Sequence, residues 1–472
     1  MGEKLKGIRL RRETIALGLL LLIAFGLRVA WLGTIPGNIT ADEADNLTTI
    51  FKIQVTGDPG LFDLDWKPQP AMSMYVFSAF MWVFGDNIFG MRMASAVLST
   101  LALLPFYALA RRVVQPVAAM GGAALLATGL WYLNFSRSGW ENVHVALFSL
   151  TAAWALTAGL ERRQLRWFVL AGIAAALGLY GYFAGRLILV ALLAYGPMAV
   201  WWAKGQRRFA LAGYAVLILT AIVLFLPQTA AIREDRDVFN RRTDAVYILN
   251  QDRPYLGEAS DFGIVKAQVA RNLKGFFLFD GEGFINGRYG PKGETLYDPL
   301  TGVLLLSGLV LGAYHWRKTG LWWAMLFVPL AATQIPSIMT PNGARALIAA
   351  PFMYLFIALT LDAMLNFARG RGQRIALTGV VAGVLFLSVF NVWSYFSWAQ
   401  SPETIQAREP AIELADYDLW RETLRAGFAE QRPSFQLREW EAIITVLRQR
   451  ERLQERFEEP QGRRHHGNTY QP

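Results

Sequence analysis

The feature that most constrains the fold of this chain is a series of apolar runs, each close to twenty residues long. A run of that length allows an α-helix to cross the hydrocarbon core of a bilayer, and repeated runs predict a polytopic membrane protein. The composition agrees, because 54% of the 472 residues are hydrophobic and only 17% are charged. The predicted fold class is therefore all-α, and a soluble globule is excluded.

Basic clusters in the loops predict how the chain is oriented. Six of them alternate with segments rich in Asp, Glu, Asn and Trp, and the positive-inside rule places all six in the cytoplasm. They lie at residues 4–12, 111–112, 161–166, 204–208, 315–318 and 368–374. The N-terminus is then inside and the C-terminus outside. The net charge of +10 reflects these loops rather than a nucleic-acid partner.

The apolar stretches between these loops divide into about eleven transmembrane helices. The expected spans are 14–33, 92–110, 114–133, 142–160, 166–184, 186–203, 209–228, 299–315, 320–336, 346–366 and 375–397. One further stretch, 70–85, would reverse the side of every later basic cluster if it crossed the membrane. It is also short for a span, so we predict a helix in the outer interface. The alternative is a true span with compensation elsewhere.

Loops and ends divide the chain into two expected parts. Residues 1–398 form a transmembrane domain with two larger outer loops, 34–91 and 229–298. Residues 399–472 form a helical outer-face segment with a tail. The chain has no cysteine, which excludes disulfides, thiolate metal sites and a cysteine nucleophile.

Ionisable residues gather on the predicted outer side. An acidic cluster in "NITADEADN" follows the first apolar run, and Glu141 lies at the outer end of a later helix. The cations on the same side are Lys67, Arg92, Arg137, Arg186 and Arg345. Charges at membrane depth are costly and mark functional sites, although a single helix-end arginine can also snorkel to the headgroups. Several cations beside an acidic cluster therefore favour a site.

This combination of charges suits one kind of chemistry. A carboxylate can remove a proton from an acceptor hydroxyl, and fixed cations can stabilise negative charge that develops on a leaving group. A phosphate leaves as a stable anion without a general acid, and a lipid phosphate arrives from the bilayer itself. The residues therefore indicate group transfer from a lipid phosphate to an acceptor on the outer face, without identifying the group.

Four stretches, taken in order, resemble a known family. They are "DEA" after the first helix, "WKPQP", "FGMRMASAVLSTLALLPFYALARR" and "LNFSRSGWENVH". Together they resemble the C-type (GT-C fold) glycosyltransferases that use lipid-phosphate sugars, of the protein O-mannosyltransferase and lipid A aminoarabinose transferase kind. Segments 179–187 and 335–351 are also similar to bacterial members, and the resemblance is clearest over residues 20–205. It implies a GT-C-like bundle with interfacial helices in the first outer loop.

The resemblance also implies roles for individual positions. Asp42 matches the catalytic base, with Glu43 beside it, and Lys67 matches a lysine that contacts the donor phosphate. Arg137 and Glu141 match an element near the donor and near a metal where one is used. Relatives often have Lys-Pro-Pro where this chain has "KPQP", so the local turn is expected to differ.

Further assignments complete the predicted site. Arg345 matches an arginine near the carrier phosphate, and the outer location of Arg186 and Arg92 adds them to the donor-phosphate group. Glu141 and His144 are spaced i,i+3, so both can face one divalent metal ion. No organic cofactor is predicted.

Simpler structural roles stay open for the same residues. Asp42 and Glu43 can cap an interfacial helix, because acids favour its positive N-terminal end. Arg137 and Glu141 are spaced i,i+4 and can form only a local ion pair.

The predicted function is transfer of a sugar from a polyprenyl-phosphate donor to a hydroxyl of a protein or glycolipid, with inversion, at the outer face of the plasma membrane. The expected partners are that donor, the acceptor and membrane lipids. One alternative is a transporter or flippase of a lipid-linked substrate, which predicts paired repeats or broken helices. Another is an inactive scaffold of the same fold. The sugar, the acceptor, the oligomeric state and the role of 399–472 do not follow from the sequence.

Overall fold

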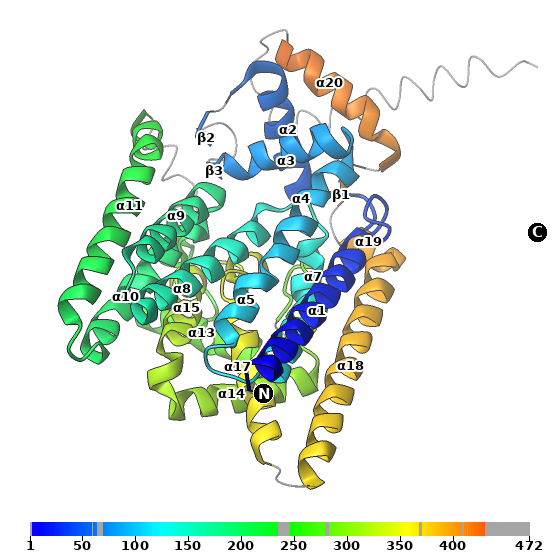
Figure 1. Ribbon diagram of the computed structural model, residues 1–472. Helices are drawn as coiled ribbons and strands as arrows, with labels where there is room; N and C mark the ends of the chain where they lie inside the picture. Colours follow the sequence, from blue (N-terminus) through cyan, green and yellow to red (C-terminus); the bar gives the residue numbers. More distant parts are fainter. Residues whose placement is uncertain are drawn as a thin grey trace, which may run out of the picture.

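In the residues that the computed structural model describes, the regular structure is helical apart from four strands of two or three residues. It describes residues 2–58, 60–63, 69–234, 246–278, 283–367, 371–407, 410–412 and 414–429. Figure 1 shows most helices running in one general direction as a bundle, with α2, α3, α20 and the strands gathered at one end. The N-terminus lies toward the other end.

Each of the eleven expected spans contains a helix. In order they are α1 (Gly2–Val29), α4 (Ile88–Leu101) with α5 (Leu103–Ala110), α6 (Pro116–Thr128) with α7 (Leu130–Ser136), α8 (His144–Arg162), α9 (Leu165–Gly181), α10 (Arg186–Trp202), α11 (Arg207–Glu234), α14 (Pro299–Tyr314), α15 (Trp316–Gln334), α17 (Ala350–Phe367) and α18 (Arg371–Gln400). Among the described residues, six helices are long and apolar enough to cross a membrane, or seven if α6 and α7, bent by 62°, count as one span. An all-helical membrane protein is confirmed; eleven crossings stay a prediction.

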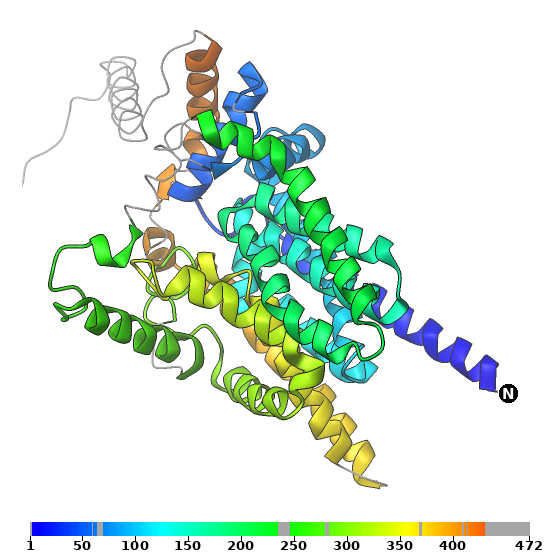
Figure 2. The ribbon, with the colours of Figure 1, turned by 90° about the vertical axis from the view of Figure 1, so that its left-hand side faces the viewer.

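The centre of the bundle is α17, which is buried on every side along most of its length. A helix that is apolar all round belongs in the interior. Small residues let its neighbours approach closely: a Cβ on Gly308 of α14 would lie 2.0 Å from the Phe356 carbonyl oxygen. By contrast, α11 and α18 expose leucine, valine and phenylalanine side chains along their length, as expected for lipid-facing helices. Figure 2 shows α9, α10 and α11 stacked side by side on one face.

The stretch 70–85 forms α3 (Met72–Phe84), a helix of 13 residues. This is too short to cross a bilayer, which needs about 20 residues. Figure 1 shows α3 lying across the end of the bundle, where it packs against α2 (Ala41–Thr56) and α4. The short hairpin of β2 (Phe62–Asp63) and β3 (Gln69–Pro70) precedes it.

The C-terminal segment returns to the first outer loop. β4 (Pro410–Ile412) pairs antiparallel with β1 (Ile39–Thr40), directly before α2. Beyond it, α20 (Tyr417–Ala429) lies along α2, and the rings of Trp420 and Phe51 are 5.7 Å apart. The helical character expected after residue 399 thus appears in α19 (Pro402–Ala407) and α20, while the division into two domains stays a prediction.

Candidate active site

The acidic cluster forms the first turn of α2. Thr40 is the N-cap: its hydroxyl accepts a hydrogen bond from the Glu43 amide, and the Glu43 carboxylate accepts one from the Thr40 amide. This is a capping box, encoded locally by the Thr-x-x-Glu spacing. Helix geometry then gives Asp42 and Glu43 different surroundings, because successive residues lie about 100° apart around the axis.

Glu43 is fully buried and bound to the bundle. Its two carboxylate oxygens accept hydrogen bonds from Nε and Nη2 of Arg92, at 2.8 and 3.0 Å. The amide of Gly139 donates to the same carboxylate at 2.8 Å. These bonds join α2 to α4 and to the turn before α8. Glu43 therefore attaches the start of α2 to the rest of the bundle. It also caps α2, which is the simpler role that the sequence left open.

The structure places Arg92, which the sequence assigned to the donor phosphate, in the protein interior. Its side chain is fully buried, and besides Glu43 it donates to the backbone carbonyls of Pro36 and Asn38 at 2.8 and 3.0 Å. A charge-assisted, bidentate pair with additional hydrogen bonds compensates the loss of hydration that burial imposes. These hydrogen bonds hold the loop between α1 and α2 and the first turn of α2, while a contact of Arg92 with the donor phosphate stays a prediction.

Arg137 is engaged by the backbone in a similar way. Its guanidinium is buried and donates to backbone carbonyls at and beyond the C-terminal end of α1, at 2.9 Å for Arg28 and 2.6 Å for Ala30. The last carbonyls of a helix lack partners within the helix and carry partial negative charge, so a cation is stabilised there. Arg137 therefore caps α1. Among the described residues no ion pair joins Arg137 to Glu141, and Glu141 accepts a hydrogen bond from Asn46 at 2.8 Å.

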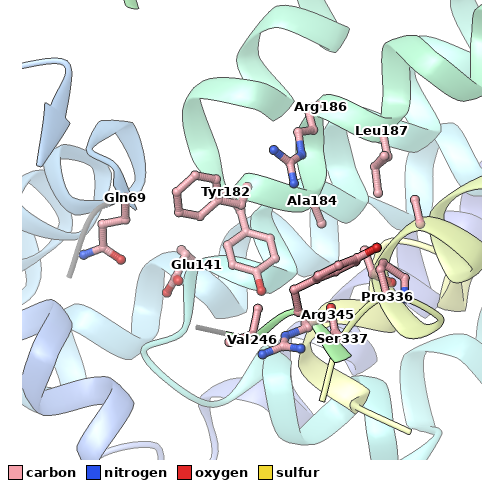
Figure 3. A pocket seen from close by; sticks show the side chains of 14 residues that line it. Gln69, Glu141, Tyr182, Ala184, Arg186, Leu187, Val246, Pro336, Ser337 and Arg345 are labelled. Atoms are coloured by element: carbon pink, nitrogen blue, oxygen red, sulfur yellow. The ribbon is translucent and has the colours of Figure 1, made fainter. Parts of the chain in front are cut away.

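A cavity of about 180 Å³ brings together several predicted residues. Arg186, at the start of α10, and Arg345, in α16 (Gly343–Ala346), both line it, together with Glu141. Figure 3 shows the two guanidinium groups on different sides of one space, with Glu141 to one side of them. The remaining lining residues are Gln69, Tyr182, Phe183, Ala184, Leu187, Val246, Tyr247, Ala332, Thr333, Pro336 and Ser337.

Asp42 contacts the second outer loop. Its carboxylate pairs with the Arg288 guanidinium at 3.1 Å, and both side chains stay partly exposed, at 26% and 19%. Beside Arg288, the pKa of Tyr289 is raised well above its usual range, first by burial and then by the negative charge of Asp42. The positive charges of Arg288 and Arg345 act on it in the opposite sense. Tyr289 is thus close enough to Asp42, Arg288 and Arg345 for the charge of each to act on it.

Sequence reasoning missed Arg288 and Tyr289. They follow the glycine-rich stretch "FDGEGFING" and lie about 246 residues from Asp42 along the chain. The available signal was an "NGRYG" turn with a cation and an aromatic residue inside an otherwise polar outer loop. Lys67, the remaining predicted cation, lies outside the described residues.

The predicted metal ligands do not converge with a third one. His144 Nδ1 hydrogen-bonds the Ser73 hydroxyl at 3.0 Å, and its ring packs against Phe77. Within the part of the chain that the structure describes, no group of three His, Asp or Glu side chains is placed to hold a metal ion. The residues present therefore do not fit the predicted site, and no chemical step below uses a metal.

Comparison with known proteins agrees with the predicted resemblance. Residues 68–230 match the profile of the family described as dolichyl-phosphate-mannose-protein mannosyltransferase. Over 240 residues the chain is 33% identical to an undecaprenyl phosphate-alpha-4-amino-4-deoxy-L-arabinose arabinosyl transferase of Pseudomonas aeruginosa, strain UCBPP-PA14, with 47% of this chain and 41% of the relative covered. The chain thus spans about two fifths of the length of the curated relatives that it matches.

Solved structures extend the likeness to most of the fold. Apo oligosaccharyltransferase from Archaeoglobus fulgidus is 13% identical, with a TM-score of 0.54 over 88% of this chain and 59% of its own. A complex of it with Zn and sulfate is 16% identical, with a TM-score of 0.50 over 84% and 53%. ArnT from Cupriavidus metallidurans, bound to undecaprenyl phosphate, is 13% identical, with a TM-score of 0.51 over 87% and 75%.

The fold is therefore that of the C-type glycosyltransferases, as the sequence resemblance predicted. Within that class, the chain is related to the dolichyl-phosphate-mannose-protein mannosyltransferase family through residues 68–230.

Proposed function

We propose that this protein transfers a sugar from a polyprenyl-phosphate donor to an acceptor hydroxyl. The observation that carries the proposal is the placement of Arg186 and Arg345 on one cavity, together with the Asp42 carboxylate, whose charge acts on Tyr289 as that of Arg345 does. Cations on one side and a carboxylate on the other are the two parts that this reaction requires. The undecaprenyl phosphate bound to the related ArnT supports the choice of carrier.

The phosphate of the donor would bind to Arg186 and Arg345. Arg186 is exposed, and Arg345 makes only a long hydrogen bond, at 3.3 Å, from its Nη1 to the Ile338 carbonyl, so both can engage an anion. Guanidinium groups match phosphate oxygens in geometry. Their hydrogen bonds to these oxygens strengthen as negative charge develops on the phosphate. We assign Lys67 as a third cation on the strength of the family resemblance alone.

Asp42 would act as the general base. The acceptor oxygen attacks the anomeric carbon while the bond from that carbon to the phosphate oxygen breaks. The hydroxyl proton passes to Asp42, and polyprenyl phosphate leaves with the electron pair. Arg288 holds the carboxylate in place from outside. A base on one side and an anionic leaving group on the other fit a single in-line displacement with inversion and no covalent sugar–enzyme intermediate.

Glu43 takes a different role in this scheme. Because its oxygens are engaged by Arg92 and Gly139, it positions the first turn of α2 and thereby Asp42. The acceptor would approach from the outer face of the plasma membrane, in the eleven-span topology, and would be a hydroxyl of a protein or glycolipid.

A transporter remains the second candidate because α6 and α7 form a broken helix, bent by 62°. The bend also has a local explanation. Asn134 of α7 donates hydrogen bonds to the carbonyls of Arg288 and Tyr289, at 3.1 and 2.9 Å. The bent segment thus holds the loop that supplies the partner of Asp42, which favours the transferase.

Purified protein in lipid nanodiscs tests the proposal. A radiolabelled undecaprenyl-phosphate sugar is incubated with candidate protein and glycolipid acceptors, and labelled product and released undecaprenyl phosphate are measured together. A transferase yields both in equal amounts. Movement of intact donor across a proteoliposome without release would establish the transporter, and absence of both activities would establish the scaffold.

A further inference from the structure

The Gln69 side chain is buried without hydrogen bonds. It is 3% exposed, and neither its Nε2 nor its Oε1 has a hydrogen-bond partner among the described residues. A buried amide that lacks its partners costs about 1–3 kcal/mol, and such groups are rare in folded proteins. A bound ligand that supplies the missing hydrogen bonds would account for such a buried amide.

The backbone around Gln69 restricts where the amide can go. Gln69 belongs to β3, opposite Asp63 in the β2–β3 hairpin, and the Ala71 amide closes the hairpin by donating to the Leu61 carbonyl at 3.1 Å. Proline stands on both sides of Gln69 in the sequence. Proline fixes its own φ and confines the residue before it to extended conformations. The side chain is therefore presented from a stiff support.

Gln69 lines the same cavity as the two arginines. Figure 3 shows it on the hairpin side of this space, with Glu141 and Tyr182 in the region between it and Arg345. The cavity thus has a cationic part, suited to phosphate, and a neighbouring part with an amide, a carboxylate and aromatic rings. The second part has the chemistry of a sugar site, because hydroxyl and amino groups both donate and accept hydrogen bonds.

We propose that Gln69 binds a hydroxyl or amino group of the donor sugar and determines which sugar the protein accepts. This inference rests on the proposed function and adds the recognition of the sugar to it. An amide offers one acceptor and two donor hydrogens, so it pairs with a sugar substituent in either role. A sugar without a matching substituent leaves the amide unpaired, and that penalty is the source of the discrimination.

Binding to the full-length protein in nanodiscs tests this role. Three probes are used: undecaprenyl phosphate without sugar, undecaprenyl-phosphate mannose and undecaprenyl-phosphate 4-amino-4-deoxy-L-arabinose. Gln69→Leu should weaken binding of the preferred sugar donor about 10–100-fold and bring the two sugar donors toward equal affinity. Its affinity for undecaprenyl phosphate should not change. Gln69→Glu, which keeps the shape but loses the two donor hydrogens, should also alter the ratio between the sugars.

Gln228 of α11 provides a matched control. It is equally buried and also lacks side-chain partners among the described residues, but it does not line the cavity. Gln228→Leu should leave all three affinities and the ratio unchanged. If Gln69→Leu weakens all three probes alike, its role is to support the hairpin; if it changes none, the amide is satisfied by water. Either result overturns the inference.

The proposed function is tested separately, by measuring undecaprenyl phosphate binding. The unsubstituted protein should bind undecaprenyl phosphate, and Arg345→Ala should weaken that binding. If the unsubstituted protein does not bind undecaprenyl phosphate, the proposed function fails and the role of Gln69 fails with it. If it binds the carrier and both sugar donors but Gln69→Leu keeps their ratio, only the role of Gln69 is overturned.

Discussion

Asp42 and Glu43 are neighbours in the sequence, yet one faces a partly exposed arginine and the other a buried one. Asp42 pairs with Arg288 at 3.1 Å, while Glu43 pairs with Arg92 at 2.8 Å with both side chains fully buried. The first pair can open to admit an acceptor, because water compensates the separated charges. The second cannot open without leaving two charges in the protein interior. The two acids should therefore respond differently to substitution.

Asp42→Asn should preserve folding and donor binding but slow sugar transfer about 10²–10⁴-fold, because the variant is nearly isosteric and lacks the base. Donor affinity and transfer rate are measured on the same preparation. Transfer at close to the original rate would remove Asp42 from the chemical step.

Glu43→Gln should destabilise the protein by about 3–5 kcal/mol, because Arg92 is then a buried charge without its counter-ion. Thermal unfolding in detergent measures this. Replacing Arg92 by Met in the same variant should recover part of the loss, which a double-mutant cycle quantifies. If Glu43→Gln keeps full stability and abolishes transfer, Glu43 rather than Asp42 is the base.

Arg345→Ala and Arg186→Ala should each lower transfer about 10²–10³-fold and weaken binding of undecaprenyl phosphate, because each removes a donor to the leaving phosphate. Lys67→Ala is expected to behave in the same way. Arg111→Ala serves as the control: Arg111 pairs with Glu13 and is assigned to the cytoplasmic side. Equal damage from Arg111→Ala would contradict that assignment.

Trp420→Ala should loosen α2 without affecting the phosphate site. Trp420 is buried against Phe51 of α2, and truncating a buried tryptophan typically costs about 3–5 kcal/mol. Hydrogen exchange in α2 should accelerate and transfer should fall, while undecaprenyl phosphate binding is retained. Leu419→Ala is the matched control, since Leu419 is the preceding residue on α20 and is 37% exposed. Unchanged exchange in α2 would show that α20 does not hold it.

A tag at Gln471 should be accessible from outside intact cells, and a tag within 204–208 should not, because the loop charges place them on opposite sides. Labelling with a membrane-impermeant reagent checks both positions. A protected C-terminus would contradict the eleven-span topology.

The sequence by itself determined the features that depend on neighbouring residues. Runs of apolar residues define the helices, because each span must satisfy its backbone hydrogen bonds internally in lipid. The Thr-x-x-Glu spacing defines the start of α2, and loop charge together with a short apolar stretch indicated that 70–85 does not cross. These signals act over a few residues or through composition, so they can be read without knowing how the chain folds back.

Only the tertiary structure decided which charge meets which. Arg92 and Arg137 have the same helix-end position as Arg345 in the sequence pattern. In the structure Arg92 donates to a buried carboxylate and Arg137 to backbone carbonyls, whereas Arg345 lines the cavity. Asp42 finds its partner in Arg288, on a distant loop, and Gln69 is left unpaired beside the arginines. Such pairings depend on how helices pack across the bundle. Hydropathy and local spacing carry no information about that packing, because an arginine at a helix end has the same sequence signature whether it faces a carbonyl, a carboxylate or a cavity.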